Sequence, residues 1–131
     1  MRALLNKVVL IGAGLTGVLL LFLGLHRFVM PELAAQGYGL PAGGDAGPWM
    51  QATGMRDVAL GVGVIGVLWK YRGAIPLMLG CVILLPIADA AIVVASGEAL
   101  KSAATHMVSG TGLAVLLLLS VLNQRIEPQP A

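Results

Sequence analysis

An Arg-Asp step, Arg56-Asp57, lies near the head of a segment that is rich in Val, Ala, Leu, Ile and Gly. Asp89 interrupts the next apolar segment, and His106 stands at the start of the last one. Charged side chains in lipid-length segments are costly, generally face the interior of a bundle, and mark functional sites by default. Carboxylates, a guanidinium and an imidazole can bind a polar group or exchange a proton with it. These residues are therefore the first candidates for a site.

The composition indicates that most of the chain lies in a membrane. Hydrophobic residues make up 58% of the 131 residues and charged residues only 11%, with a mean hydropathy of +0.93. Soluble domains carry roughly a quarter charged residues. The four apolar segments approach or reach the length of about 20 residues that crosses a bilayer. We therefore expect a single all-α domain over residues 1–131, an integral membrane four-helix bundle with helices at about 8–28, 49–69, 74–95 and 103–123.

The distribution of basic residues predicts the orientation of this bundle. Two basic residues, Arg27 and Lys101, fall on one side of the membrane. Five fall on the other side: Arg2, Lys7, Lys70, Arg72 and Arg125. Because Lys and Arg are enriched in cytoplasmic loops, we expect both termini to be cytoplasmic in the cell membrane. The first segment could also be a signal peptide, but the absence of a clear small-residue cleavage site after it favours a retained helix.

This topology places the charged residues at a common depth. The second helix descends from the outer face, which puts Asp57 roughly 10 Å below that face. The third helix ascends, and Asp89 lies about six residues, or roughly 9 Å, before its outer end. Arg27 ends the first helix and His106 begins the fourth on the same side. We expect Arg27, Arg56, Asp57, Asp89 and His106 to form a candidate pocket in the outer half of the bundle.

Glycine and proline flank the two acids. Gly54, Asp57 and Gly61 share one stripe of a helix, so Asp57 should face a closely packed neighbour. Pro86 lies one turn before Asp89 and should kink the third helix there, because proline removes a helical hydrogen bond. Glycine faces of this kind could also join two copies of the chain, which predicts a possible homo-oligomer.

Helical geometry also suggests how the charges pair. Arg56 is rotated by about 100° from Asp57, so it should be poorly placed to bond its neighbour. We expect it to reach Asp89 across the bundle, which leaves Asp57 for Arg27 or His106. A purely structural interpretation remains open, in which these ion pairs fix the register of the helices.

The connection over residues 30–48 differs from the others because it is rich in Gly and Pro, residues that interrupt helices. It is also long for a link between two helices. We expect it to form a Gly/Pro-rich outer loop between helices 1 and 2. Two interpretations stand side by side, a lid over the outer face of the bundle and a flexible loop.

Several other functions find no support in the sequence. Residues 12–17 (GAGLTG) and 61–66 (GVGVIG) match the dinucleotide fingerprint, but that motif requires a strand–helix–strand unit, and both copies lie in lipid-length runs. The single cysteine and two histidines do not suggest a metal centre. No Lys/Arg-rich run suggests nucleic acid binding. We therefore expect no cofactor, no metal and no nucleic acid partner.

Four strings and one histidine of this chain resemble those of a known family. They are residues 26–31 (HRFVMP), 37–41 (GYGLP), 54–61 (GMRDVALG) and 86–89 (PIAD), together with His106. They resemble the small membrane family called domain of unknown function 4267, nearly from end to end, and the Gly-x-Arg-Asp-x-x-Leu-Gly string is the most specific. A weaker likeness to DoxX-type membrane families rests on helix number and layout. The resemblance singles out Arg27, Pro31, Arg56, Asp57, Asp89 and His106, and it implies no activity.

The sequence leaves three classes of function open. The leading hypothesis is a pocket that binds or acts on a small or lipid-like ligand in contact with the lipid bilayer. If it is an enzyme, metal-free acid–base chemistry by the carboxyl groups fits best, although no catalytic residue can be assigned. The alternatives are a structural or assembly subunit of a membrane complex and a small proton-coupled carrier. The scarcity of polar residues in the inner halves of the helices argues against the carrier.

Overall fold

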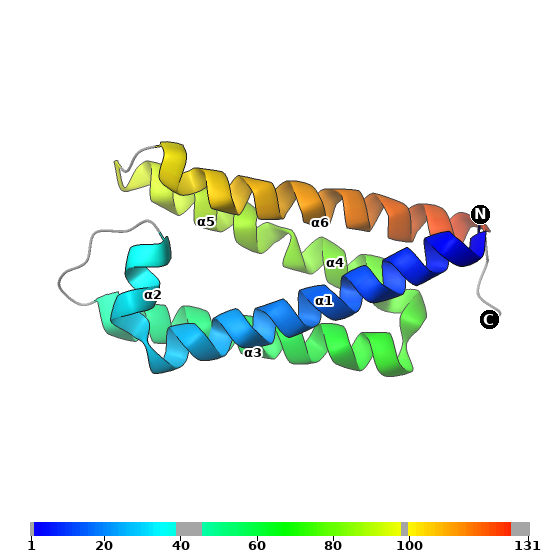
Figure 1. The fold of residues 1–131 in the computed structure, drawn as a ribbon, viewed down its shortest axis with the longest axis horizontal. Coiled ribbons are helices and arrows are strands. Elements are labelled where there is room, and N and C mark those ends of the chain that lie inside the picture. The colour runs from blue at the N-terminus through cyan, green and yellow to red at the C-terminus, as the bar shows by residue number, and fades with distance from the viewer. Residues whose placement is uncertain (1, 39–45, 98–99, 127–131) are drawn as a thin grey trace.

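The computed structural model describes residues 2–38, 46–97 and 100–126, and all of the regular structure in these ranges is helical (Figure 1). The helices in chain order are α1 (Arg2–Val29), α2 (Pro31–Tyr38), α3 (Ala46–Lys70), the short 3-10 helix η1 (Arg72–Ala74), α4 (Ile75–Val82), α5 (Leu84–Ala95) and α6 (Leu100–Ile126).

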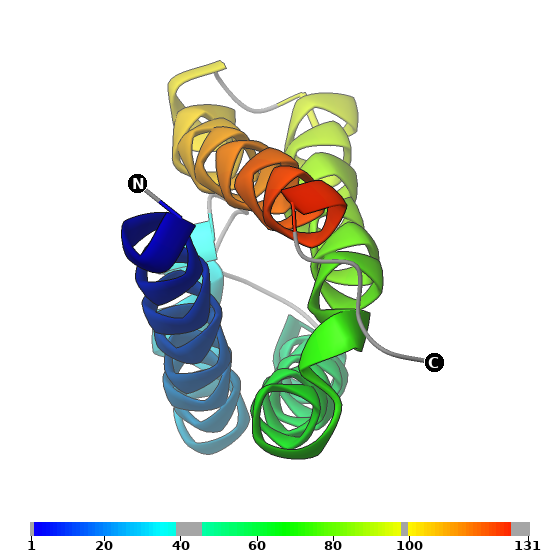
Figure 2. The same ribbon diagram turned by 90° about the vertical axis from the view of Figure 1, so that its right-hand side faces the viewer.

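Four segments of the described chain are long and apolar enough to cross a membrane: Ala3–Val29, Ala46–Lys70, Arg72–Ala95 and Ala103–Arg125. They lie lengthwise beside one another as a four-helix bundle, as the views along and down the helices show (Figures 1 and 2). The ends of α1 and α6 that lie next to the chain termini share one end of the bundle, which we call the terminal end (Figure 1). Helix α2 lies at the opposite end, which we call the α2 end. The all-helical membrane fold predicted from the sequence is thus confirmed, and the chain is a multi-pass membrane protein.

Helices α1 and α3 pack through two pairs of glycines. A Cβ atom added to Gly54 would lie 2.6 Å from the carbonyl oxygen of Gly24, and one added to Gly61 would lie 2.9 Å from the carbonyl oxygen of Gly17. Only glycine allows backbones to approach this closely. The predicted glycine stripe beside Asp57 is confirmed. These four glycines already make the contact between α1 and α3 within one chain. They are therefore not available for a contact with a second copy.

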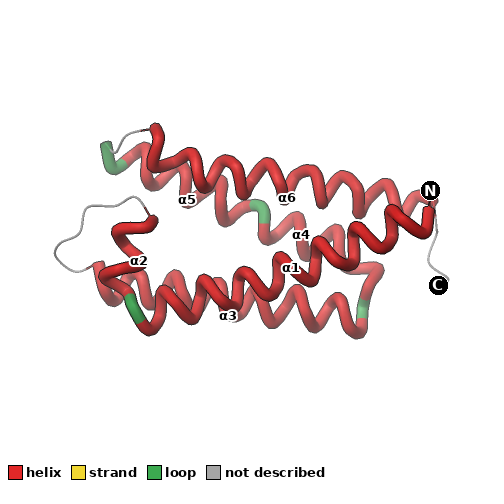
Figure 3. The backbone as a smooth tube through the Cα atoms, in the orientation of Figure 1, coloured by secondary structure: helices red, strands yellow, loops and turns green. Residues whose placement is uncertain are grey.

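The third span is interrupted one turn before Pro86. Helix α4 ends at Val82 and α5 begins at Leu84, and the break is visible as a short loop (Figure 3). The Ile83 N–H still donates to the Leu79 carbonyl at 2.9 Å. Proline has no N–H to donate to the carbonyl four residues earlier, which is that of Val82. The predicted irregularity before Asp89 is confirmed.

Part of the connection between the first two spans is an ordered helix. Helix α2 buries Ala34, Ala35 and Tyr38 against Met50 of α3 and Val93 of α5. The described part of this connection therefore contributes to the core of the α2 end, and it does not form the free loop that one interpretation expected. The middle of the Gly/Pro-rich loop, residues 39–45, lies outside the described residues.

A second core cluster lies toward the terminal end. Val9 and Ala13 of α1 pack with Ile75 and Leu79 of α4 in a fully apolar group. The outward faces of the helices carry exposed Leu, Val, Ile and Phe side chains along the spans. Apolar outer faces of this extent fit a lipid surrounding. Arg27, Arg56, Asp57 and Asp89 lie between this cluster and α2, whereas the other charged residues of the spans, Lys7, Lys70, Arg72 and Arg125, lie at the terminal end.

Candidate functional site

Two arginines and two aspartates form one chain of ion pairs across three spans. Asp57 accepts a hydrogen bond from Arg27 through its Oδ2 atom. Its Oδ1 atom accepts from both Nε and Nη2 of Arg56, each at 3.0 Å. Arg56 reaches on through Nη1 to Oδ1 of Asp89 at 3.4 Å. The order Arg27–Asp57–Arg56–Asp89 alternates positive and negative groups, and the four formal charges sum to zero.

The carboxylates are the most deeply buried members of this ion-pair chain. Asp57 is 1% exposed and Asp89 4%, whereas the side chains of Arg27 and Arg56 are 14% and 35% exposed. A buried carboxylate is tolerated only where opposite charges and hydrogen bonds compensate its lost hydration. Asp57 receives three such hydrogen bonds, so it is the central acceptor of the site.

One expected pairing was wrong, and α3 begins earlier than predicted. Arg56 does bond its neighbour Asp57, because its long flexible stem folds back across the 100° that separates adjacent helix positions. Helix α3 also begins at Ala46 instead of near Trp49. Asp57 therefore lies eleven residues into the helix, or about 17 Å along its axis. The predicted pairs of Arg27 with Asp57 and of Arg56 with Asp89 are both found.

Within the described residues, His106 joins this region through Tyr38 and not through an acid. Its Nε2 atom lies 3.1 Å from the backbone carbonyl oxygen of Tyr38, and the two rings pack with centroids 4.7 Å apart. The guanidinium carbon of Arg27 lies 5.3 Å from the centroid of the Tyr38 ring, within the range of a cation–π contact. Tyr38 thus links α2 to α1 and α6.

Sequence reasoning did not single out Tyr38 as a member of the site. Its only signal was its place in the GYGLP string of the connection, where an aromatic residue stands between two glycines. Tyr38 is 3% exposed, and within the described residues its hydroxyl has no hydrogen-bond partner. The site therefore includes a buried phenol ring beside Arg27.

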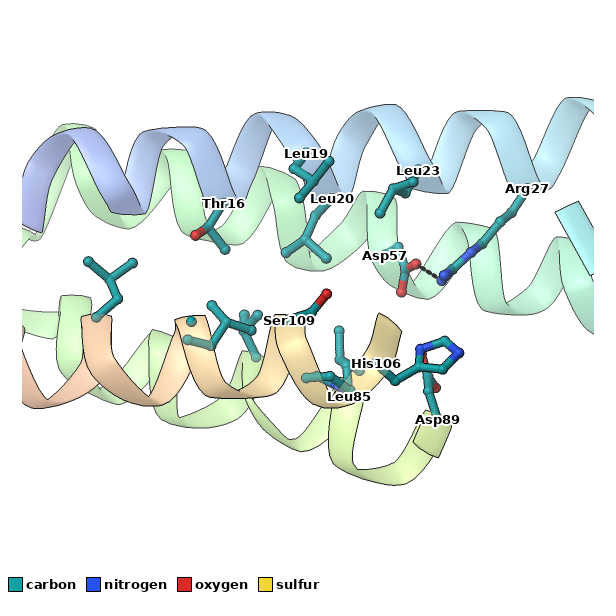
Figure 4. A pocket seen from close by; sticks show the side chains of 15 residues that line it. Thr16, Leu19, Leu20, Leu23, Arg27, Asp57, Leu85, Asp89, His106 and Ser109 are labelled. Carbon is teal, nitrogen blue, oxygen red and sulfur yellow. Dashed lines mark hydrogen bonds and ion pairs between the residues drawn. The ribbon is translucent and has the colours of Figure 1, made fainter. Parts of the chain in front are cut away.

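A cavity of about 260 Å³ lies between α1 and α6. One end of it is polar, with Arg27, Asp57, Asp89 and His106 in its wall. The remainder is mainly apolar, formed by leucines of α1, α5 and α6: Leu19, Leu20, Leu23, Leu85, Leu113 and Leu116. Figure 4 shows the α1 side chains pointing across this space toward Ser109 and His106 of α6.

The cavity is open on its lateral side. Leu19 is 54% exposed, and the lining residues Ser109 and Gly112 are also exposed. Arg56 is not part of its wall and lies behind the two aspartates that it joins. Within the described residues no group of three or more His, Cys, Asp and Glu side chains is placed to hold a metal ion. The arrangement can hold an amphipathic molecule, with its polar group at the charged end and its apolar part along the leucines.

We predict that Tyr38 stays protonated well into the alkaline range. Burial raises the pKa of its phenol above the usual value near 10, and the neighbouring Asp89 carboxylate raises that pKa further. Between the unfolded and the folded pKa the folded state holds the extra proton, so stability should fall as the pH rises above about 10. Phenolate absorbance of a Tyr71→Phe variant, in which Tyr38 is the remaining tyrosine, measures this directly. Phenolate formation with a midpoint near pH 10 in the folded protein would contradict it.

No curated protein and no solved structure matches this chain. Residues 17–120 match the family described as Domain of unknown function (DUF4267), and this range contains the whole ion-pair chain, Tyr38 and His106. The match covers well over half of the sequence, so the chain belongs to the DUF4267 family.

Proposed function

We propose that this protein binds a small uncharged amphipathic molecule from the bilayer in the cavity between α1 and α6. The observation that carries the proposal is the division of this cavity into a charged end and an apolar remainder. The polar group of the ligand lies beside Asp57, Asp89 and His106. Its apolar part lies along the leucines of α1 and α6.

The charge balance of the site selects the head group. Arg27 and Arg56 neutralise Asp57 and Asp89, so the site is balanced in charge without a counter-ion. A ligand with a net charge would add an uncompensated charge at membrane depth, which costs about 2.5–3.5 kcal/mol on insertion scales. An alcohol or amide group can donate a hydrogen bond to the carboxylates, and a carbonyl oxygen can accept one from Arg27, without this cost.

The size and lateral position of the cavity fit a ligand that arrives through the membrane. Its volume of about 260 Å³ lies just below the range of roughly 300–1,000 Å³ typical of drug-sized ligands. A single alkyl chain with a small head matches this space. In the proposed orientation the terminal end is cytoplasmic, because Lys7, Lys70, Arg72 and Arg125 lie there. The ligand then enters from the outer leaflet.

A structural or assembly subunit is the second candidate, and the ion-pair chain itself favours it. Each of the four charged groups already has a partner, which is sufficient to fix the register of α1, α3 and α5. A carrier has less support. The apolar cluster around Val9, Ala13, Ile75 and Leu79 lies between the charged site and the terminal end, and it offers no polar partner to a polar substrate or proton on that route.

Ligand binding can be tested with three probes that share one chain length and differ in head charge: dodecanol, dodecanoate and dodecyltrimethylammonium. The protein is reconstituted in nanodiscs, and saturable thermal stabilisation reports binding. We expect dodecanol to stabilise the protein at concentrations about 100-fold below those of the ionic probes, which is the ratio that a charge penalty of about 2.5–3.5 kcal/mol implies.

Leu20→Trp fills the cavity, because Leu20 lines it. Leu15→Trp is the matched control on the same helix, since Leu15 is exposed on the outer face. We expect dodecanol to stabilise the wild type and Leu15→Trp but not Leu20→Trp. The double variant Arg56→Gln/Asp89→Asn removes one charge of each sign and should fold with weakened dodecanol binding. Equal responses of both tryptophan variants, or no saturable response in the wild type, would leave the structural role as the better explanation.

A further inference from the structure

A second cavity, of about 200 Å³, lies at the terminal end of the bundle. It is separated from the α1–α6 cavity by the apolar cluster around Val9, Ala13, Ile75 and Leu79. Its polar lining residues come from three elements: Asn6 of α1, Arg72 of η1, and Ser120, Asn123 and Gln124 of α6. Such a concentration of polar side chains is unusual in a chain in which only 11% of the residues are charged.

Hydrogen-bond donors predominate in the wall of this cavity. Arg72 uses Nε to bond the Leu68 carbonyl at 3.3 Å, and its two terminal nitrogens have no partner within the described residues. Asn123 donates to Asn6 at 3.4 Å, which leaves further amide N–H groups on both side chains. No carboxylate lines the cavity in the described part of the chain. The remaining donors can serve an anion.

The wall is held in place by contacts that do not use these donors. Gln124 donates to the backbone carbonyl of Gly73, beside Arg72, and ties α6 to the turn that carries the guanidinium. Ser120 is 2% exposed and donates to the Leu117 carbonyl at 2.7 Å, so its oxygen faces the site only as an acceptor. Helix α4 begins next to the cavity, at Ile75 and Pro76. The positive end of its dipole favours a negative group there.

We propose that this cavity binds a phosphate group, with Arg72 as its principal ligand and Asn6 and Asn123 as further donors. A guanidinium matches the geometry of phosphate oxygens and can form two hydrogen bonds to them. The exposed basic residues Lys7, Lys70 and Arg125 lie at the same end of the bundle and raise the local concentration of anions. The phosphate comes either from a lipid of the adjoining leaflet or from solution, because the cavity lies where the bilayer ends.

Native mass spectrometry of the protein in a neutral detergent can test this site. The probes are phosphatidic acid, diacylglycerol with the same chains, and inorganic phosphate. We expect one phosphatidic acid adduct per chain and no comparable diacylglycerol adduct. Arg72→Gln should weaken the adduct about tenfold or more, as the loss of a charge-assisted bidentate contact implies. Lys70→Gln is the matched control: it removes the same charge at the same end, and Lys70 does not line the cavity.

The outcomes separate the sources of phosphate and the rival explanation. If millimolar inorganic phosphate displaces phosphatidic acid, the site also takes a soluble anion. If the phosphatidic acid adduct persists in that phosphate, the ligand is the lipid head group. Equal weakening by Arg72→Gln and Lys70→Gln, or equal binding of diacylglycerol, overturns the proposal in favour of general surface charge or non-specific lipid contact. Asn123→Asp places a carboxylate in the cavity and should abolish the adduct as well. This second variant keeps the test decisive if Arg72→Gln does not fold.

Discussion

Asp57→Asn is expected to destabilise the bundle by about 3–5 kcal/mol, the cost of removing one partner from a buried ion pair. Asp57 is 1% exposed and is the common acceptor for Arg27 and Arg56. Its neutralisation leaves two guanidinium groups and a single remaining carboxylate, that of Asp89. The site then carries a net positive charge at membrane depth, where a charge is costly.

The free energy of unfolding in mixed micelles measures this effect, with Glu32→Gln as the control. Glu32 is an exposed carboxylate of α2 outside the spans, so the same chemical change there should have little effect. The double variant Arg27→Gln/Asp57→Asn restores charge balance and keeps the Arg56–Asp89 pair. We expect it to be more stable than Asp57→Asn alone. If the double variant loses the full sum of the two single effects, the pair is not coupled and this account of the site fails.

The fold and the four residues of the ion-pair chain could be predicted from the sequence, because each prediction rests on a periodic or compositional signal. Four lipid-length apolar runs predict four spans, and the stripe of Gly54, Asp57 and Gly61 predicts which face of α3 meets a neighbour. The rule that charges face the interior of a bundle then brings Arg27 and Asp89 toward Asp57, as the ion pairs show. These signals do not depend on the rotamer of any side chain.

The remaining features depend on side-chain conformation and on local starts of helices, which carry weaker signals. Arg56 has enough rotatable bonds to reach Asp57 and Asp89 together, and helix geometry alone constrains only its Cβ direction. The Gly- and Pro-rich composition of residues 30–48 favoured a loop, yet tertiary burial stabilises the short helix α2. Tyr38 was missed for this reason, because its role exists only once α2 packs on the bundle.

The glycine contact between α1 and α3 is coupled to the ion-pair chain, because this contact sets how closely Arg27 approaches Asp57. A Cβ atom added to Gly54 would lie 3.1 Å from the Cβ of Arg27, in addition to its clash with the Gly24 carbonyl oxygen at 2.6 Å. Backbone atoms cannot rotate away as a flexible side chain can. Any side chain at position 54 must therefore push α1 from α3 at the level of the ion pairs.

Gly54→Ala is accordingly expected to cost about 1–3 kcal/mol or more, the range for overpacked interiors, although alanine is the better helix former by about 1 kcal/mol. Gly66→Ala is the matched control on the same helix: its added Cβ meets no described atom within 4 Å, so only the helix propensity changes and stability should rise or stay unchanged. Unfolding in mixed micelles gives both values.

Because Gly54→Ala also weakens the bond of Arg27 to Asp57, combining it with Asp57→Asn should cost less than the sum of the two single changes. Additive effects would mean that the glycine contact stabilises the helices without positioning the charges, and equal effects of the two alanines would refute the close α1–α3 contact itself.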